Sequence, residues 1–203
     1  MCFPISAFEF LKKKNEKIDD LKIEKNNLIV GIGRLTRQKN FLLLIRAFKE
    51  ILIKYPNYHL ILLGEGEQEK LLKEEIIKLE LQNKISLLGY QKNVYQYLLN
   101  SDCFILTSLW EDPGFVLIEA ALANTLIISS NCPNGPNEIL SNGQNGFLFQ
   151  NNNLSDLLNK FEEFKNLTED ELNKKKLFAK KQIKKFTQFA HFQSLKNIIN
   201  LNE

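Results

Sequence analysis

Cysteine and histidine, the residues that build disulfide frameworks and zinc sites, are scarce in this chain of 203 residues. The three cysteines, Cys2, Cys103 and Cys132, are too few and too scattered for either kind of site. Neither histidine, His59 or His191, has further ligands near it in the sequence, so we expect no metal site. Free cysteines also favour a reducing, cytoplasmic location.

Long apolar runs are absent as well. No apolar segment reaches the roughly 20 residues that a membrane-spanning helix needs. The first residues, MCFPISAFEFLKKKNEK, carry their lysines after the apolar stretch, whereas a secretory signal carries its basic residues before it. We therefore expect neither a membrane span nor a signal peptide.

Acidic residues are scarce in one segment, 170–203. It has eight lysines against three acidic residues, a local net charge of +5 in a chain whose total is +3. A basic amphipathic segment is either a solvated helix face or a contact for an anionic membrane surface or a phosphorylated partner. The aromatic sheet motif of RNA-binding domains is missing, so no nucleic acid is expected.

Short apolar runs alternate with helical patterns from residue 28 onward. Strands are predicted at 28–32, in YHLILL, KISLL and DCFIL, near 126–129 and around 147–149. Helices are predicted in NFLLLIRAFKEILIK, EQEKLLKEEIIKLEL, VYQYLL and GPNEIL, near 116–122, and from Leu154 onward. This alternation predicts an α/β, Rossmann-like parallel sheet with helices on both faces.

Loops that follow parallel strands gather at one edge of the sheet, and open α/β sheets bind their ligands there. The loops at 33–39, 64–67, 89–91, 108–115 and 131–138 all follow predicted strands. We therefore expect these loops to face one cleft.

The first of these loops lies in GIGRLTRQKN. Thr36 replaces the third glycine of a dinucleotide-binding motif, and no P-loop is present. What remains is a turn at Gly33 with two cationic residues, Arg34 and Lys39, beside it. Together they could bind a diphosphate. The alternative is that both cations are solvated.

The fourth loop lies in SLWEDPGFVLIEAAL, where Pro113 and Gly114 introduce a helix. The backbone N–H groups of its first turn, 114–117, are expected to point into the cleft. Glu111 precedes the turn and Glu119 lies about one helical turn inside, so both carboxylates could hold sugar hydroxyls. The alternatives are that Glu119 is a surface residue and that Glu111 only stabilises the helix through its charge near the positive end of the helix dipole.

Glu111 and Glu119 form an E-x7-E pair. Together with VGIGRLTRQKNF, LLGEGEQEKLL, LLGY and GPNEIL…NGFLF, in that order, the pair resembles the nucleotide-sugar-binding half of the retaining glycosyltransferases of family 4. Those enzymes have the GT-B fold, in which two Rossmann-like domains face each other across the active site. The resemblance implies that a hexose or N-acetylhexosamine passes from a UDP-sugar to a surface-glycan or lipid-linked acceptor with retention. It implies no cofactor and no metal.

The resemblance also implies roles for single residues. Arg34 and Lys39 would neutralise the leaving diphosphate, and Glu111 would face the donor sugar; these are the three expected catalytic residues. Glu119 would hold the ribose hydroxyls. The other expected substrate-binding residues are Gly33, Gly64, Gly89, Tyr90, Ser108, Gly114, Phe115 and Val116. EDPGFV departs from the commoner E-G-F-G or E-P-F-G by an extra residue and a missing second glycine.

The expected organisation has three parts. Residues 1–27 would be an interdomain link or N-terminal extension, 28–169 the donor-binding domain, and 170–203 helices that pack on an N-terminal acceptor domain, which this chain does not include. Self-association or a separate N-terminal-half chain could then complete the cleft. The alternative function is an inactive half-domain that serves as a binding or assembly partner. The expected location is cytoplasmic, with peripheral contact at the inner face of the membrane as an option.

Overall fold

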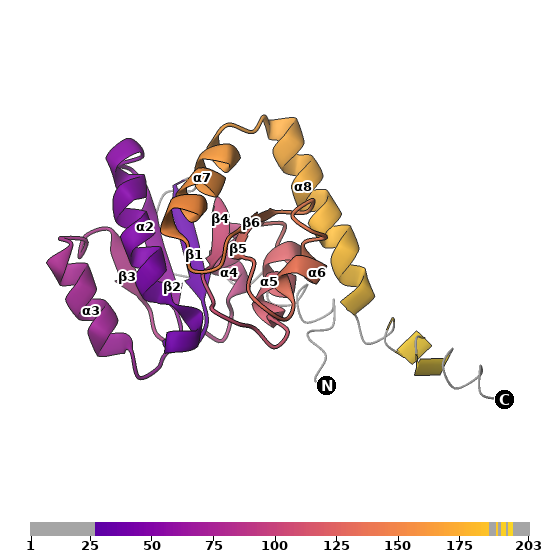
Figure 1. The fold of residues 1–203 in the computed structure, drawn as a ribbon, viewed down its shortest axis with the longest axis horizontal. Coiled ribbons are helices and arrows are strands. Elements are labelled where there is room, and N and C mark those ends of the chain that lie inside the picture. The colour runs from indigo at the N-terminus through magenta and orange to yellow at the C-terminus, as the bar shows by residue number, and fades with distance from the viewer. Residues whose placement is uncertain (1–26, 187–189, 191, 194, 197–203) are drawn as a thin grey trace.

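A six-stranded parallel sheet forms the centre of the molecule (Figure 1). The computed structural model describes residues 27–186, 190, 192–193 and 195–196, so the predictions made for 1–26 lie outside the described residues. The strand order is β3-β2-β1-β4-β5-β6, and every pairing is parallel. The strands are β1 (Leu28–Ile32), β2 (His59–Leu63), β3 (Ile85–Leu87), β4 (Cys103–Leu106), β5 (Leu126–Ser130) and β6 (Phe147–Phe149). The predicted α/β, Rossmann-like fold class is confirmed.

Helices connect the strands. They are α2 (Phe41–Lys54), α3 (Glu69–Lys78), α4 (Tyr95–Leu99), α5 (Phe115–Leu122), α6 (Pro136–Ile139), α7 (Leu154–Lys165) and α8 (Glu169–Gln182), with short 3-10 turns η1 (Arg37–Lys39) and η2 (Ile183–Phe186). As predicted, the pattern after Leu154 is helical, in two separate helices, and Thr168 caps the start of α8. The Thr168 hydroxyl accepts the N–H of Glu171, and the Glu171 carboxylate accepts the N–H of Thr168. This reciprocal capping box starts a separate helix.

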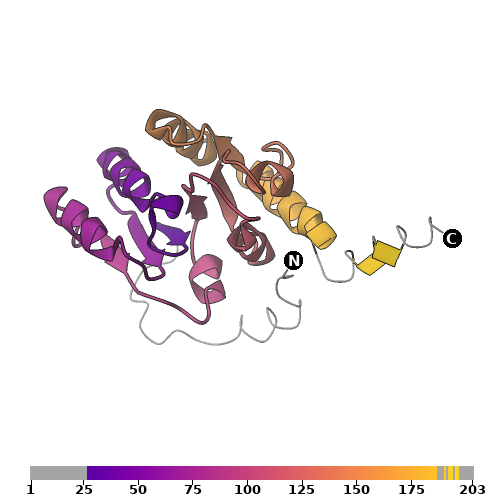
Figure 2. The same ribbon diagram turned by 60° about the horizontal axis from the view of Figure 1, so that its bottom comes forward.

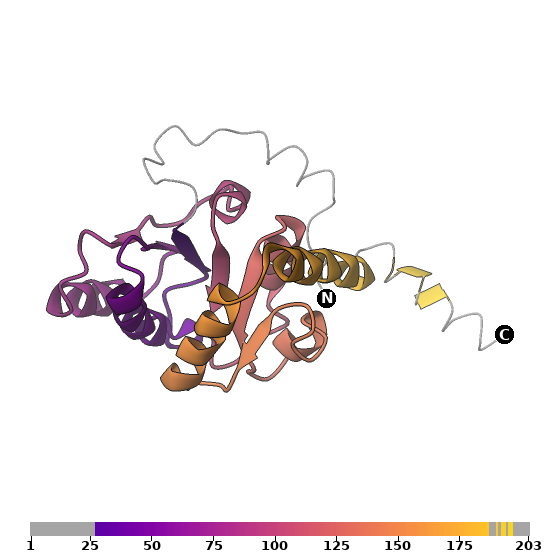
Figure 3. The ribbon, with the colours of Figure 1, turned by 90° about the horizontal axis from the view of Figure 1, so that it is seen from above.

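The sheet is buried on both faces, which is why its strands read as continuous apolar runs. In β1, Ile29 belongs to the core beneath α2, α3 and α7, whereas its neighbour Val30 belongs to the core beneath α4, α5 and α8. Figures 2 and 3 show these two helix layers on opposite sides of the sheet.

Part of the basic C-terminal segment packs on this same domain. Ala179 of α8 and Ile183 of η2 are buried in the core that α5 also covers. The expected domain boundary between 169 and 170 lies directly after Glu169, the first residue of α8. Within the described residues, no helix combines the length and the apolar character that a membrane span requires.

Candidate functional site

The loops that follow the strands meet at the carboxyl edge of the sheet, as expected. Backbone hydrogen bonds of 2.8 to 3.0 Å link neighbouring loops in series. These bonds run from Leu35 N to Glu65 O, from Gly64 N to Gly89 O, from Leu109 N to Gln38 O and from Glu111 N to Pro133 O. Segments far apart in the sequence therefore form one continuous edge.

Two glycines allow these loops to approach each other closely. A Cβ on Gly64 would lie 2.0 Å from the carbonyl oxygen of Gly33, and a Cβ on Gly135 would lie 1.9 Å from that of Pro113. Both glycines also have positive φ, +138° and +120°. No other residue fits these positions without moving the backbone.

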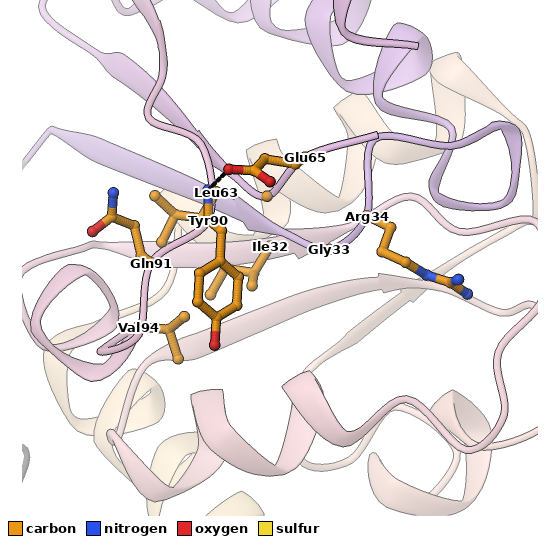
Figure 4. Close-up of a pocket in the computed structure, with 9 residues that line it drawn as sticks. Ile32, Gly33, Arg34, Leu63, Glu65, Tyr90, Gln91 and Val94 are labelled. Carbon is orange, nitrogen blue, oxygen red and sulfur yellow. Dashed lines mark hydrogen bonds between the residues drawn. The ribbon is translucent and has the colours of Figure 1, made fainter. Parts of the chain in front are cut away.

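A cavity of about 410 Å³ opens between the loops after β1, β2 and β3. Its lining combines apolar side chains with polar groups: Ile32, Gly33, Arg34, Leu63, Gly64, Glu65, Tyr90, Gln91 and Val94. Figure 4 shows Tyr90 on the same side of the cavity as Gln91 and Val94, with Arg34 at the other side and pointing away. The volume lies in the range of sites for small molecules and cofactors.

Four of the residues predicted from the sequence line this cavity: Gly33, Arg34, Gly64 and Tyr90. Tyr90 is 72% exposed, and its backbone N–H donates to a carboxylate oxygen of Glu65 at 3.3 Å. Sequence reasoning missed Glu65 and Gln91 as lining residues. The signal was available, because both lie in loops that were expected to face the cleft.

Beside the cavity, a buried ion pair joins the loops after β1 and β4. The Nζ of Lys39 lies 2.6 and 2.9 Å from the two carboxylate oxygens of Glu111, and the hydroxyl of Ser108 donates to the first of these oxygens at 2.5 Å. The side chains of Lys39 and Glu111 are only 13% and 4% exposed. A carboxylate buried this deeply needs such partners, because an unpaired one would be costly.

Lys39 also connects the ion pair to the cavity. Its Cε lies 3.0 Å from the place where a Cβ of Gly33 would be, so the lysine stem covers this glycine. Gly33 lines the cavity, and the cavity and the ion pair are therefore adjacent. Arg34 is exposed and forms no ion pair within the described part of the chain.

Hydrogen bonds to its backbone hold the loop that carries Glu111. The carbonyl of Ser108 accepts from the Ser130 hydroxyl at 2.6 Å, and the carbonyl of Trp110 accepts from the Gln38 amide at 2.9 Å. Burial raises the pKa of the nearby Cys132 thiol, and the charge of Glu111 raises it further.

Helix α5 begins directly after this loop. Gly114, at φ +84°, precedes the helix, and Phe115 and Val116 are half-buried in its first turn. The expectation that the N–H of Leu117 faces the cleft is wrong, because this group donates to the carbonyl of Gly114 at 3.0 Å. Within the described residues we find no internal acceptor for the N–H groups of Phe115 and Val116. Glu119 is half-buried further along the helix.

Comparison with known proteins agrees with this geometry. The family model for glycosyl transferases group 1 matches residues 12–182. An uncharacterized glycosyltransferase of Methanocaldococcus jannaschii is 50% identical over 113 residues, which cover 56% of this chain and 28% of that protein. The N-acetylgalactosamine-N,N'-diacetylbacillosaminyl-diphospho-undecaprenol 4-alpha-N-acetylgalactosaminyltransferase of Campylobacter jejuni is 30% identical over 154 residues, 76% of this chain and 40% of that protein.

A solved structure with the same fold is Anabaena Alr3699/HepE in complex with UDP. Its TM-score is 0.79 at 22% identity, over 96% of this chain and 52% of that chain. The present chain thus spans well under half the length of the two relatives named above. The family match covers most of the chain, and the parallel sheet is that of a GT-B half. We conclude that this chain belongs to the group 1 glycosyl transferases and has the Rossmann-like fold of their C-terminal, nucleotide-sugar-binding domain.

Proposed function

We propose that the carboxyl edge of the sheet binds a UDP-sugar, and that the chain is the donor-binding half of a retaining transferase. The observation that carries this proposal is the buried ion pair of Lys39 and Glu111 beside the cavity of about 410 Å³. The transferred unit would be a hexose or an N-acetylhexosamine. The acceptor would be a surface glycan or a lipid-linked sugar at the inner face of the membrane, where the protein would be peripheral. The name of the Campylobacter relative supports this acceptor class.

The ion pair retains capacity to bind a donor. An ammonium group has three N–H donors, and Lys39 directs at most two of them at Glu111. The third can bind an oxygen of the diphosphate and stabilise the negative charge that develops as the diphosphate leaves. Arg34, which is exposed and follows Gly33 directly in the chain, can bring a second cation to the same group.

Glu111 likewise keeps one oxygen available for the sugar. One of its oxygens accepts from both Lys39 and Ser108, whereas the other accepts only from Lys39. A carboxylate oxygen accepts about two hydrogen bonds, so the second oxygen can take a sugar hydroxyl. The N–H groups of Phe115 and Val116 at the start of α5 would bind the same ligand, and Glu119 would hold the ribose.

The cavity would hold the base. Its apolar walls include Ile32 and Val94, and the exposed ring of Tyr90 lies at its edge. Gly64 lines the cavity, and its N–H donates to the carbonyl of Gly89 at 2.8 Å, which joins the two turns beside it. A transfer reaction also needs an acceptor held in the same closed cleft. The complete reaction is therefore proposed for this chain together with an acceptor-binding half.

A second candidate is a half-domain that binds without transferring. The EDPGFV loop, with an extra residue at the sugar-facing position, favours it. Such a protein would copurify with a separate N-terminal-half chain or associate with itself. Turnover by the isolated monomer would contradict this candidate.

The proposed function is tested by calorimetric titration of the chain with UDP, GDP and ADP, repeated on Glu119→Ala. We expect UDP to bind with the highest affinity, and we expect the variant to lose most of that affinity because the ribose hydroxyls lose their acceptor. The matched control is Glu74→Ala on α3, an exposed glutamate on the opposite helix layer. A folded protein that binds none of the three nucleotides would contradict the proposal.

A further inference from the structure

Helix α8 has two different faces. Leu172, Ala179 and, after the helix, Ile183 lie along the face that packs on the domain. The opposite face exposes Leu177 and Phe178, each 50% exposed, together with the exposed Lys174, Lys181 and Lys185. We call these five residues the outer face of α8. Lys174, the adjacent pair Leu177 and Phe178, Lys181 and finally Lys185, which lies in η2, follow one another in steps of three or four residues, so together they form one stripe.

The outer face is strongly basic. No Asp or Glu occurs between positions 172 and 196 of the sequence. Lys181 and Lys185 form no ion pair within the part of the chain that the structure describes. The Nζ of Lys181 lies 5.7 Å from the ring centre of Phe178, so charge and apolar surface are side by side.

Lys175, just outside the stripe, differs from Lys181 and Lys185 because its charged group contacts the domain. The Nζ of Lys175 donates to the carbonyls of Gly143 and Gly146, both at 3.3 Å, and lies 4.8 Å from the ring centre of Phe147. Lys175 thus holds α8 on the domain. Lys181 and Lys185 make no comparable contact with the described part of the domain, so they are available to an external partner.

The basic end of α8 lies toward the functional edge of the sheet. Near its start, Leu172 and Lys176 line a cavity with Asp102, which precedes β4 at the opposite, amino edge. At its end, the Gln182 amide donates at 3.4 Å to the carbonyl of Glu138 in α6, the short helix that follows β5. Figure 1 shows α8 running along this side of the sheet.

We propose that the outer face of α8 docks on an anionic lipid surface. Apolar side chains next to lysines on one helix face are the pattern of interfacial helices, in which the lysines attract acidic headgroups and the apolar groups enter the boundary. A second copy of the same face would be repelled by like charge. Nucleic acid would use the lysines but not Leu177 and Phe178. The orientation would bring the carboxyl edge of the sheet near the lipid surface.

The test is cosedimentation of the 203-residue chain with vesicles. Vesicles of phosphatidylcholine alone should leave the protein in solution, whereas vesicles that also contain phosphatidylglycerol should sediment it, less so at high salt. Lys181→Glu with Lys185→Glu should weaken binding by at least about 25-fold, since each of the two lysines contributes roughly fivefold near an anionic surface. Leu177→Asp with Phe178→Asp should abolish it.

The matched controls lie on the opposite helix layer. Ile53→Asp on α2 and Lys70→Glu on α3 replace residues that are also exposed and should bind like the parent. Because all the changed side chains are exposed, thermal unfolding should confirm that every variant is folded. The proposal is overturned if the parent protein does not sediment with the anionic vesicles, or if the Leu177→Asp, Phe178→Asp variant still binds them. It is also overturned if the controls lose as much vesicle binding as the variants of the outer face. Calorimetry with UDP is a separate measurement, so the proposed function and this surface can fail independently.

Discussion

Replacing Lys39 by methionine is the perturbation whose result follows most directly from the geometry of the site. It leaves Glu111, 4% exposed, with the Ser108 hydroxyl as its remaining side-chain partner among the described residues. Removing one partner of a buried ion pair costs about 3–5 kcal/mol. Lys39 is itself 13% exposed, so we take the lower end, about 3 kcal/mol, as the expected loss. In a chain of this size that loss lowers the melting temperature by roughly 6–12 °C.

The double variant Lys39→Met with Glu111→Gln separates the charge from the packing. The introduced glutamine side chain would be uncharged and could keep the hydrogen bond from Ser108, while the introduced methionine side chain would still cover Gly33. We therefore expect the double variant to be more stable than Lys39→Met alone, with a coupling free energy of about 2 kcal/mol. The measurement is urea unfolding followed by circular dichroism for the parent, both single variants and the double variant.

Lys73→Met is the matched control. Lys73 pairs with Glu69 at the same 2.6 Å distance, but the two side chains are 59% and 42% exposed. An exposed pair contributes less than about 1 kcal/mol, so this change should be small. The reasoning is refuted if Lys39→Met and Lys73→Met lose equal stability, because burial would then not decide the effect.

Three further outcomes are expected. Gly64→Ala should lower both stability and UDP affinity, because its Cβ would lie 2.0 Å from a backbone oxygen. Gly143 also has positive φ, but a Cβ there would meet no such clash. Calorimetry should therefore show a smaller loss of stability and of UDP affinity for Gly143→Ala. Burial lowers the pKa of Lys176, so the unfolded state binds this proton more tightly than the folded state does. The free energy of unfolding should therefore rise as pH increases toward 10.5. Urea titrations of Lys176→Met at the same pH values should show a smaller rise. Burial raises the pKa of the Cys103 and Cys132 thiols, so a thiol reagent at neutral pH should modify both only as fast as the protein opens.

Much of the fold could be predicted from the sequence because the sheet is buried on both faces. Each strand is then an unbroken apolar run, and LIVGI at 28–32 was located to the residue. The expected boundary between 169 and 170 came within one residue of the start of α8, where Thr168 and Glu171 have the spacing of a capping box.

The site was predicted less completely than the fold. The sequence indicated that Lys39 and Glu111 both face the cleft, but it could not indicate that they pair with each other. Their contact joins residues 72 positions apart and depends on β1 and β4 being neighbours in the sheet. Periodicity predicts strands and not their order, so a contact of this kind needs the structure.

Hydrogen exchange of the chain with and without saturating UDP tests the central claim, a nucleotide-sugar site at the carboxyl edge of the sheet, most directly. The account predicts slower exchange at 33–39 and 108–119, where the ion pair and the start of α5 would contact the diphosphate and the ribose. It also predicts unchanged exchange in α3, which lies in the helix layer opposite that of α5. Unchanged exchange at both loops in the folded protein would contradict the account.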